Sequence, residues 1–148
     1  MTPLRSTDPG VPRRAPFAAP GLVFDAEAVW TLFEGRTDRM KQVWQITRTV
    51  LPANLDGLAA AVAIADWPAA ARHAHSITGS ASNFGAHALV ATTRKIEDGA
   101  GRGDVPAGDV REAQAQFDTL CAAMSSWLEC VSAVPGPLAS GTEDPSGQ

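Results

Sequence analysis

The sequence contains no tyrosine, only two cysteines and no long uninterrupted apolar segment. Its longest apolar run, from Leu58 to about Ala65, falls well short of the roughly 20 residues that a membrane-spanning helix needs. No apolar export region follows Arg13-Arg14, so this pair does not act as a twin-arginine signal. We therefore expect a cytoplasmic protein.

Positive charge is also scarce, because 12 lysines and arginines stand against 16 aspartates and glutamates, a net charge of −4. Proteins that bind nucleic acid neutralise phosphates with a basic patch, and the basic residues here are scattered. The acidic balance argues against a nucleic-acid partner and equally against docking on an anionic membrane.

The cysteines, Cys121 and Cys130, fall within one predicted helix. At 1.5 Å per residue their spacing corresponds to roughly 13 Å along the helix axis. A disulfide needs Cα atoms within about 7 Å, so these two cannot pair with each other. Two cysteines also make no zinc motif, and we expect reduced thiols that are partly packed in a core.

The chain has 148 residues, of which 45% are hydrophobic, enough for one domain with a real core. Abundant alanine favours helix over strand. The proline-rich start and the end of the chain show little apolar periodicity. We predict disordered tails at residues 1–21 and 133–148 around a helical bundle at residues 22–132.

Apolar spacing and capping residues predict five helices. The first is capped by Asp25 and runs through Phe33. The other four cover about Asp38–Ala65, Trp67–Phe84, His87–Ala100 and Val110–Val131. Asp66 with Pro68 gives a helix-start signature, and we expect Gly99, Gly101 and Gly103 to end the fourth helix. Short loops between apolar faces indicate an all-α fold, an antiparallel four-helix bundle with a short additional N-terminal helix.

The second predicted helix carries many apolar residues. We expect its buried stripe to comprise Met40, Val43, Ile46 and Val50, and then, after a step of one residue near Pro52, Leu55, Leu58 and Val62, with Leu51 at the step.

The third predicted helix holds the residues most informative about chemistry. Its core face consists of Ala70, Ala74, Ile77, Ala81 and Phe84. At about 100° per residue, His75 lies roughly 140° from the centre of that face and should point to solvent.

Gly79 lies one helical turn after His75, and a glycine inside a helix costs about 1 kcal/mol relative to alanine. Two explanations are available. Gly79 leaves the surface beside His75 bare so that a bulky partner group can approach, or it permits close helix packing. Its predicted exposure favours the first.

The run His75-Ser76-Ile77-Thr78-Gly79-Ser80-Ala81-Ser82-Asn83-Phe84-Gly85-Ala86 resembles the signature of the histidine phosphotransfer (HPt) domain family of bacterial two-component phosphorelays. In that family the phosphoacceptor histidine is followed by an apolar residue and then, in most members, by a lysine. A glycine and several small residues come next. The resemblance extends from about Val23 to Val131, including Asp66-Trp67 and Ile96-Glu97-Asp98. It implies that His75 is the phosphoacceptor.

One departure from the family pattern concerns Thr78, which stands where the family usually has Lys or Arg. Threonine can donate one hydrogen bond to a phosphoryl group but brings no charge. Arg72, one turn before His75, or Arg94 on the next helix could supply the charge instead. The departure leaves open slower transfer, a changed partner preference or an inactive pseudo-domain.

The resemblance also points to Glu97, because HPt domains can place a polar residue there that hydrogen-bonds the acceptor imidazole. A carboxylate at Glu97 could accept a hydrogen bond from the N–H of one ring nitrogen and leave the other nitrogen nucleophilic. The alternative is an ordinary solvated glutamate near a helix end.

The other two histidines carry less weight. His73 lies about 60° from the centre of the core face, which favours a structural, hydrogen-bonded role. His87 follows Gly85-Ala86 at a helix start and is expected at the surface. A metal site would need convergent side chains, but His73 and His75 lie on different sides of one helix. We expect no metal site and no bound cofactor.

The function implied by the resemblance is a relay of a phosphoryl group between receiver-domain aspartates through His75, in either direction. The partners would be response-regulator receivers and a hybrid histidine kinase, with Mg²⁺ bound by the receiver. The segment from Gly99 to Gly103 lacks the Lys-Ser/Thr of a Walker loop, and no ATP-binding kinase domain fits the remaining length. We expect a phosphocarrier rather than an enzyme, and a monomer.

Two other functions stay open on the sequence alone. One is a non-phosphorylated HPt-like module that only binds receivers, and the other is a helical bundle of unrelated role. For receiver contacts we consider Val29, Trp30 and Phe33 on the first helix and the edge around Ala71, although Trp30 is better explained as a core residue.

Overall fold

The computed structural model describes residues 23–133, and these form five α-helices and no strand. The helices are α1 (Ala26–Leu32), α2 (Thr37–Ala63), α3 (Trp67–Ser82), α4 (His87–Arg102) and α5 (Ala107–Ala133). The all-α prediction is confirmed, and each predicted helix has its counterpart. The predicted N-terminal tail and residues 134–148 of the C-terminal one lie outside the described residues.

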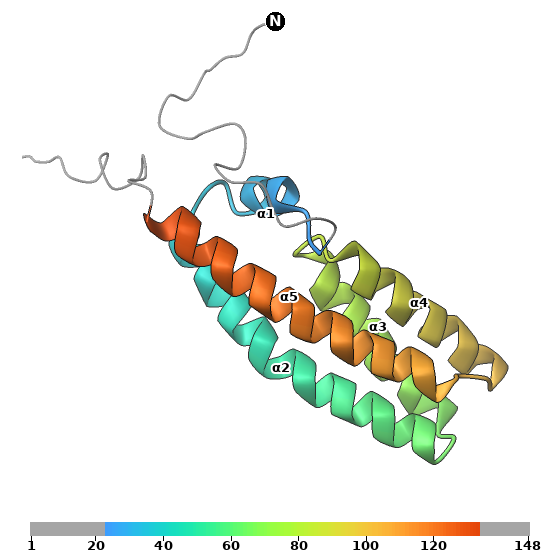
Figure 1. The fold of residues 1–148 in the computed structure, drawn as a ribbon. Coiled ribbons are helices and arrows are strands. Elements are labelled where there is room, and N and C mark those ends of the chain that lie inside the picture. Colours follow the sequence, from blue (N-terminus) through green and yellow to red (C-terminus); the bar gives the residue numbers. More distant parts are fainter. Residues whose placement is uncertain (1–22, 134–148) are drawn as a thin grey trace, which may run out of the picture.

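The four long helices form one antiparallel bundle, and the short α1 lies across one end of it (Figure 1). Helix α3 packs against α2 on one side and α4 on the other, while α5 packs against α2 and α4. The predicted four-helix bundle with a short N-terminal helix is therefore present. Helix α3 shares its longest interface with α4, so side chains on these two helices are held in a defined register.

Two aspartates start helices as their positions predict. The carboxylate of Asp25 accepts a hydrogen bond from the backbone N–H of Ala28, and that of Asp66 accepts one from Ala69. Each satisfies a backbone donor that has no partner within its own helix. Asp66 thereby defines where α3 begins and, with it, which α3 residues face the interior.

The end of α4 differs from the prediction. The helix continues through Gly99 and Gly101 and ends only at Gly103, whose φ of 72° is left-handed. Gly99 has a packing role instead, because a Cβ there would collide with the carbonyl oxygen of Asp104. A glycine is therefore required within this helix, because the chain that follows α4 occupies the space of a side chain at position 99.

The buried face of α2 also differs from the predicted one. Interior positions follow one uninterrupted stripe comprising Met40, Trp44, Thr47, Leu51, Leu55, Leu58 and Ala61. Ile46 and Val50 are 63% and 47% exposed, so they do not belong to the core. Because α2 runs through Pro52 as one 27-residue helix, its stripe keeps one phase, and the register of Leu55 and Leu58 places Trp44 and Thr47 inside.

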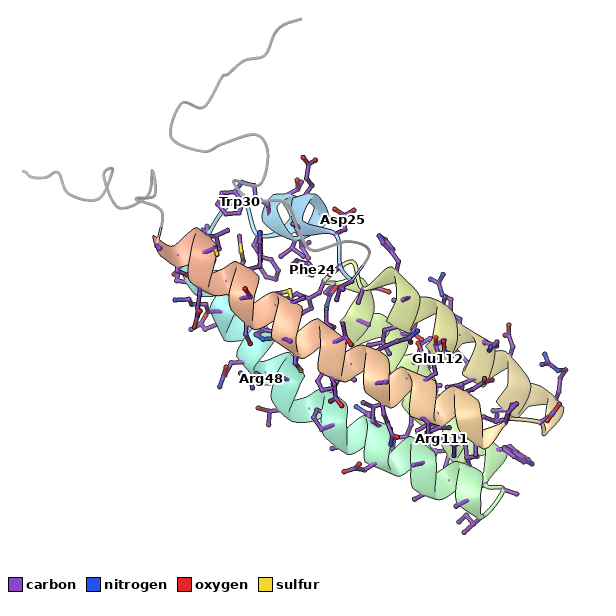
Figure 2. The ribbon with its side chains drawn as sticks, viewed as in Figure 1. Phe24, Asp25, Trp30, Arg48, Arg111 and Glu112 are labelled. Carbon is purple, nitrogen blue, oxygen red and sulfur yellow. The ribbon has the colours of Figure 1, made fainter. Side chains whose placement is uncertain are left out.

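Aromatic rings join α1 to the end of the bundle (Figure 2). The rings of Phe24 and Trp30 meet Trp127 of α5 edge to face, with centroids 5.5 and 6.4 Å away. Val29 and Trp30 are buried by this packing, so the expectation that they contact a receiver is wrong. Phe33 is partly buried and stacks at 6.1 Å on Phe84, which lies in the turn after α3.

The turn between α3 and α4 depends on Gly85. Its φ is +61°, its carbonyl accepts a hydrogen bond from the backbone N–H of Asp25, and a Cβ there would lie 2.6 Å from the Cβ of Asp25. Both the backbone conformation and the close approach of the preceding chain require a residue without a side chain.

We predict that Gly85→Ala lowers the free energy of unfolding by about 1–3 kcal/mol, because alanine is strained at this φ and would push Asp25 away. Urea unfolding measures the change. The control is Gly101→Ala in the last turn of α4, where a Cβ meets nothing within 4 Å. That variant should keep its stability or gain up to about 0.5 kcal/mol. Equal stability of the two variants would contradict the role given to Gly85.

Candidate functional site

The interior face of α3 determines which of its side chains face solvent. Ala70, Ala74, Ile77, Ala81 and Phe84 are all fully buried, as predicted. His75, on the opposite side of the helix, has a side chain that is 78% exposed. The predicted orientation of this imidazole is therefore confirmed.

Glu97 of α4 holds the ring of His75. Its Oε2 lies 3.2 Å from Nδ1 of the imidazole, and the glutamate side chain is 36% exposed. An ionised carboxylate only accepts hydrogen bonds, so Nδ1 carries the proton. In the neutral imidazole the lone pair then resides on Nε2, the nitrogen on the far side of the ring.

Gly79 leaves the surface next to His75 bare. A Cβ built at this position meets no atom within 4 Å, so no neighbouring helix lies close to it. The alternative explanation, close helix packing, is thereby excluded. The glycine instead keeps one helical turn of α3 flat beside an exposed imidazole.

Thr78 does not lie on this exposed surface. It is buried, and its hydroxyl lies 2.9 Å from the carbonyl oxygen of Ala74 and 2.7 Å from the hydroxyl of Thr93 in α4. The hydrogen bond that threonine could offer a phosphoryl group is thus used inside the bundle. Thr78 is not placed to hold a group bound to His75.

Two arginines flank the imidazole–carboxylate pair along their helices. Arg72 lies three residues before His75 on α3, and Arg94 lies three residues before Glu97 on α4. Residues three apart share one side of a helix, and both arginines are exposed. Either can bring positive charge to the same surface as His75.

His73 has a superficially similar hydrogen bond but different surroundings. Its Nδ1 lies 3.0 Å from Oδ1 of Asn54 on α2, and its ring lies against Gly57, where a Cβ would come within 2.6 Å of Nε2. The ring is half-buried, and its Nε2 edge is covered by α2. His73 is the structural histidine that its position predicted.

His87 is exposed at the start of α4, with Nε2 3.9 Å from the carboxylate of Asp25. Cys121 and Cys130 are both free, and burial raises the pKa of the Cys121 thiol. Among residues 23–133 no group of three or more His, Cys, Asp or Glu side chains could hold a metal ion. No helix in that part of the chain is long and apolar enough to span a membrane.

An exposed apolar surface on α2 was missed by the sequence reasoning. Asn54 and Gly57 contact His73, so Ile46 and Val50, which precede Asn54 by two turns and one turn, border α3 as well. The available signal was the presence of more apolar residues on α2 than one buried stripe can hold.

This apolar surface leads into a groove of about 410 Å³ at the α1 end of the bundle. Leu32, Phe33 and Val43 supply its apolar lining, and Arg36, Arg39, Glu34 and Asn83 its polar lining. Asn83, the C-cap residue of α3, follows Gly79 by four residues. The groove therefore continues the exposed surface that begins at His75.

A model of the Hpt domain family matches residues 42–127, more than half of the chain. Among solved structures, the fold is similar to that of histidine-containing phosphotransfer protein B from Pseudomonas aeruginosa PAO1, with a TM-score of 0.67 and 21% identity. The alignment covers 78% of this chain and 100% of that protein. Comparison with curated protein sequences gives no match.

The matched residues 42–127 include the segment from His75 to Ala86 and Glu97, and the solved structure has the same helical fold. The chain therefore belongs to the Hpt domain family, whose members carry phosphoryl groups on histidine in two-component signalling.

Proposed function

We propose that His75 is the phosphoacceptor of this chain and passes a phosphoryl group to and from receiver-domain aspartates. The observation that carries the proposal is the exposed imidazole whose Nδ1 is hydrogen-bonded to Glu97, beside the bare surface at Gly79. This arrangement presents one nitrogen, Nε2, to a partner. The chain then acts as a carrier rather than as an enzyme with its own phosphate donor.

The transfer step follows from the protonation of the ring. The Nε2 lone pair attacks the phosphorus of the partner's aspartyl phosphate, the N–P bond forms, and the P–O bond breaks to release the aspartate carboxylate. The ring becomes positively charged because Nδ1 keeps its proton. The carboxylate of Glu97 stabilises that charge at 3.2 Å, and the reverse transfer uses the same contact.

Phosphoryl transfer depends mainly on alignment and on neutralising the charge of the phosphoryl oxygens. Arg72 and Arg94 are the candidates on this chain, since Thr78 faces inward. The remaining positive charge would come from Mg²⁺ bound in the receiver's acidic pocket. This division of labour requires no cofactor in the Hpt chain itself.

The surface beside His75 fits a receiver. Ile46 and Val50 offer apolar contacts along α2, and Arg36 and Arg39 at the groove bring positive charge toward a partner with an acidic pocket. We infer that a receiver docks across α2 and α3, and that a hybrid histidine kinase supplies one such receiver. A cytoplasmic monomer suits this role, because the docking surface then stays open.

We predict that a phosphorylated receiver transfers label to this chain and that the label is acid-labile and base-stable, as phosphohistidine is. His75→Gln should abolish labelling because the amide nitrogen of glutamine, unlike an imidazole nitrogen, has no free lone pair to attack phosphorus. His73→Gln should retain it, because the His73 ring is covered by α2. Mass spectrometry of the labelled protein locates the phosphoryl group.

Labelling of His75→Gln would refute the assignment of the acceptor. Receiver binding without any labelling of the wild-type protein would refute phosphotransfer and leave a module that only binds receivers. Circular dichroism of both variants verifies that the bundle is folded.

We predict that Gly79→Leu slows transfer from the receiver by about tenfold or more. The same substitution should stabilise α3 by about 0.5–1 kcal/mol, because leucine is a better helix former than glycine. A side chain here would occupy the space that the partner needs beside His75. The control is Gly101→Leu, because that glycine is also helical and open. Stopped or quenched-flow labelling gives the rates, and equal rates for both variants would contradict the open-surface role.

We predict that Ile46→Glu weakens receiver binding about tenfold, equivalent to about 1.4 kcal/mol, since a charge replaces an apolar contact. Stability should change little because Ile46 is 63% exposed. The matched control is Ile64→Glu, because Ile64 is 74% exposed at the opposite end of α2. Calorimetric titration measures both affinities, and equal weakening by the two variants would place the docking surface elsewhere.

A further inference from the structure

A buried pair of hydroxyl groups joins α3 to α4 directly below the exposed site. Oγ1 of Thr78 lies 2.7 Å from Oγ1 of Thr93, and both side chains are buried. The mechanism proposed above does not use either residue. Buried polar side chains carry a desolvation cost, so a pair of them between two otherwise apolar surfaces calls for an explanation.

Each hydroxyl also has a backbone partner in its own helix. Thr78 lies 2.9 Å from the carbonyl oxygen of Ala74, and Thr93 lies 3.0 Å from that of Leu89. A hydroxyl has one proton, so one threonine donates across the interface and the other donates to its own helix. Every proton is used, and the interhelical bond exists only when the two helices are in this register.

The threonine pair and the His75–Glu97 pair are neighbouring contacts on the same helix pair. Thr78 follows His75 by three residues on α3, and Thr93 precedes Glu97 by four on α4. Because the helices are antiparallel, these steps run in the same direction, so one contact lies about one turn below the other. A slide of α4 along α3 would break both contacts together.

The exposed pair needs such support. A contact between a largely exposed imidazole and a half-exposed glutamate is weak by itself, because water competes for both groups and glutamate has three rotatable torsions. A slide by one residue would move Glu97 by about 1.5 Å, enough to lose its 3.2 Å contact. Buried hydrogen bonds resist this movement better than exposed ones.

We propose that Thr78 and Thr93 are positioning residues, which fix the register at which Glu97 holds the Nδ1–H tautomer of His75. The inference deepens the proposed function and rests on it only where transfer rates are concerned.

The test uses Thr93→Val in the full chain, because valine has nearly the same shape and the remaining Thr78 hydroxyl can still donate to Ala74. Thr93→Ser keeps the hydroxyl, and Thr92→Val is the matched control, a buried threonine on the same helix that is outside the pair. ¹⁵N-detected NMR of the His75 ring reads the tautomer without any partner. Thr78→Val repeats the test from α3.

We expect the Nδ1–H form to predominate in wild type, in Thr93→Ser and in Thr92→Val, and to give way to the Nε2–H form in Thr93→Val. Transfer from a receiver should slow about three- to tenfold in Thr93→Val. In a Glu97→Ala background the same substitution should cause no further loss, because the two residues act through one contact.

An unchanged tautomer in Thr93→Val would overturn the proposal, and so would an equal loss of rate with and without Glu97. If wild-type protein accepts no label, the proposed function fails, while the NMR measurement still decides the positioning role. If Thr78→Val does not fold, Thr93→Val and Thr93→Ser carry the test.

Discussion

The burial of one face of α3 underlies the arrangement of the site. Ile77 and Phe84 are fully enclosed by the bundle, and their side chains fix the rotation of the helix about its axis. With that rotation fixed, His75 must project into solvent and Gly79 must lie beside it. The imidazole of His75 is therefore positioned by the hydrophobic effect acting on its neighbours, and its own contacts only orient the ring.

His73 and His75 show how surroundings separate two identical side chains. Both donate from Nδ1 to an oxygen of a neighbouring helix, Asn54 in one case and Glu97 in the other. His73 bonds a neutral amide, and the Nε2 edge of its ring is covered by α2. His75 bonds a carboxylate, and its ring is exposed to solvent. Of these two histidines, only His75 combines an exposed ring with a neighbouring carboxylate, a group that stabilises a cationic imidazole.

Competition for a limited interior also determines the outer surface of the bundle. Helix α2 has more apolar residues than its single continuous stripe can bury, so Ile46 and Val50 remain outside while Thr47 is enclosed. The excess falls on the side of α2 that borders α3. Helix α3 shows the converse, since Thr78 is enclosed and finds its hydrogen-bond partner across the interface in Thr93. In both helices, the rotation of the helix about its axis decides which residues are buried, so a threonine can be enclosed while an isoleucine is exposed.

The sequence by itself determined the five helices, the caps at Asp25 and Asp66, and the outward direction of His75, because these depend on local spacing and backbone chemistry. Tertiary structure decided the rest. The phase and register of the packed helices decide which stripe of α2 is buried. They also decide whether Thr78 faces the exposed surface or Thr93. The end of α4 beyond Gly99 likewise depends on the chain that packs against it. Local periodicity leaves such choices open, because it contains no information about the partner across the interface.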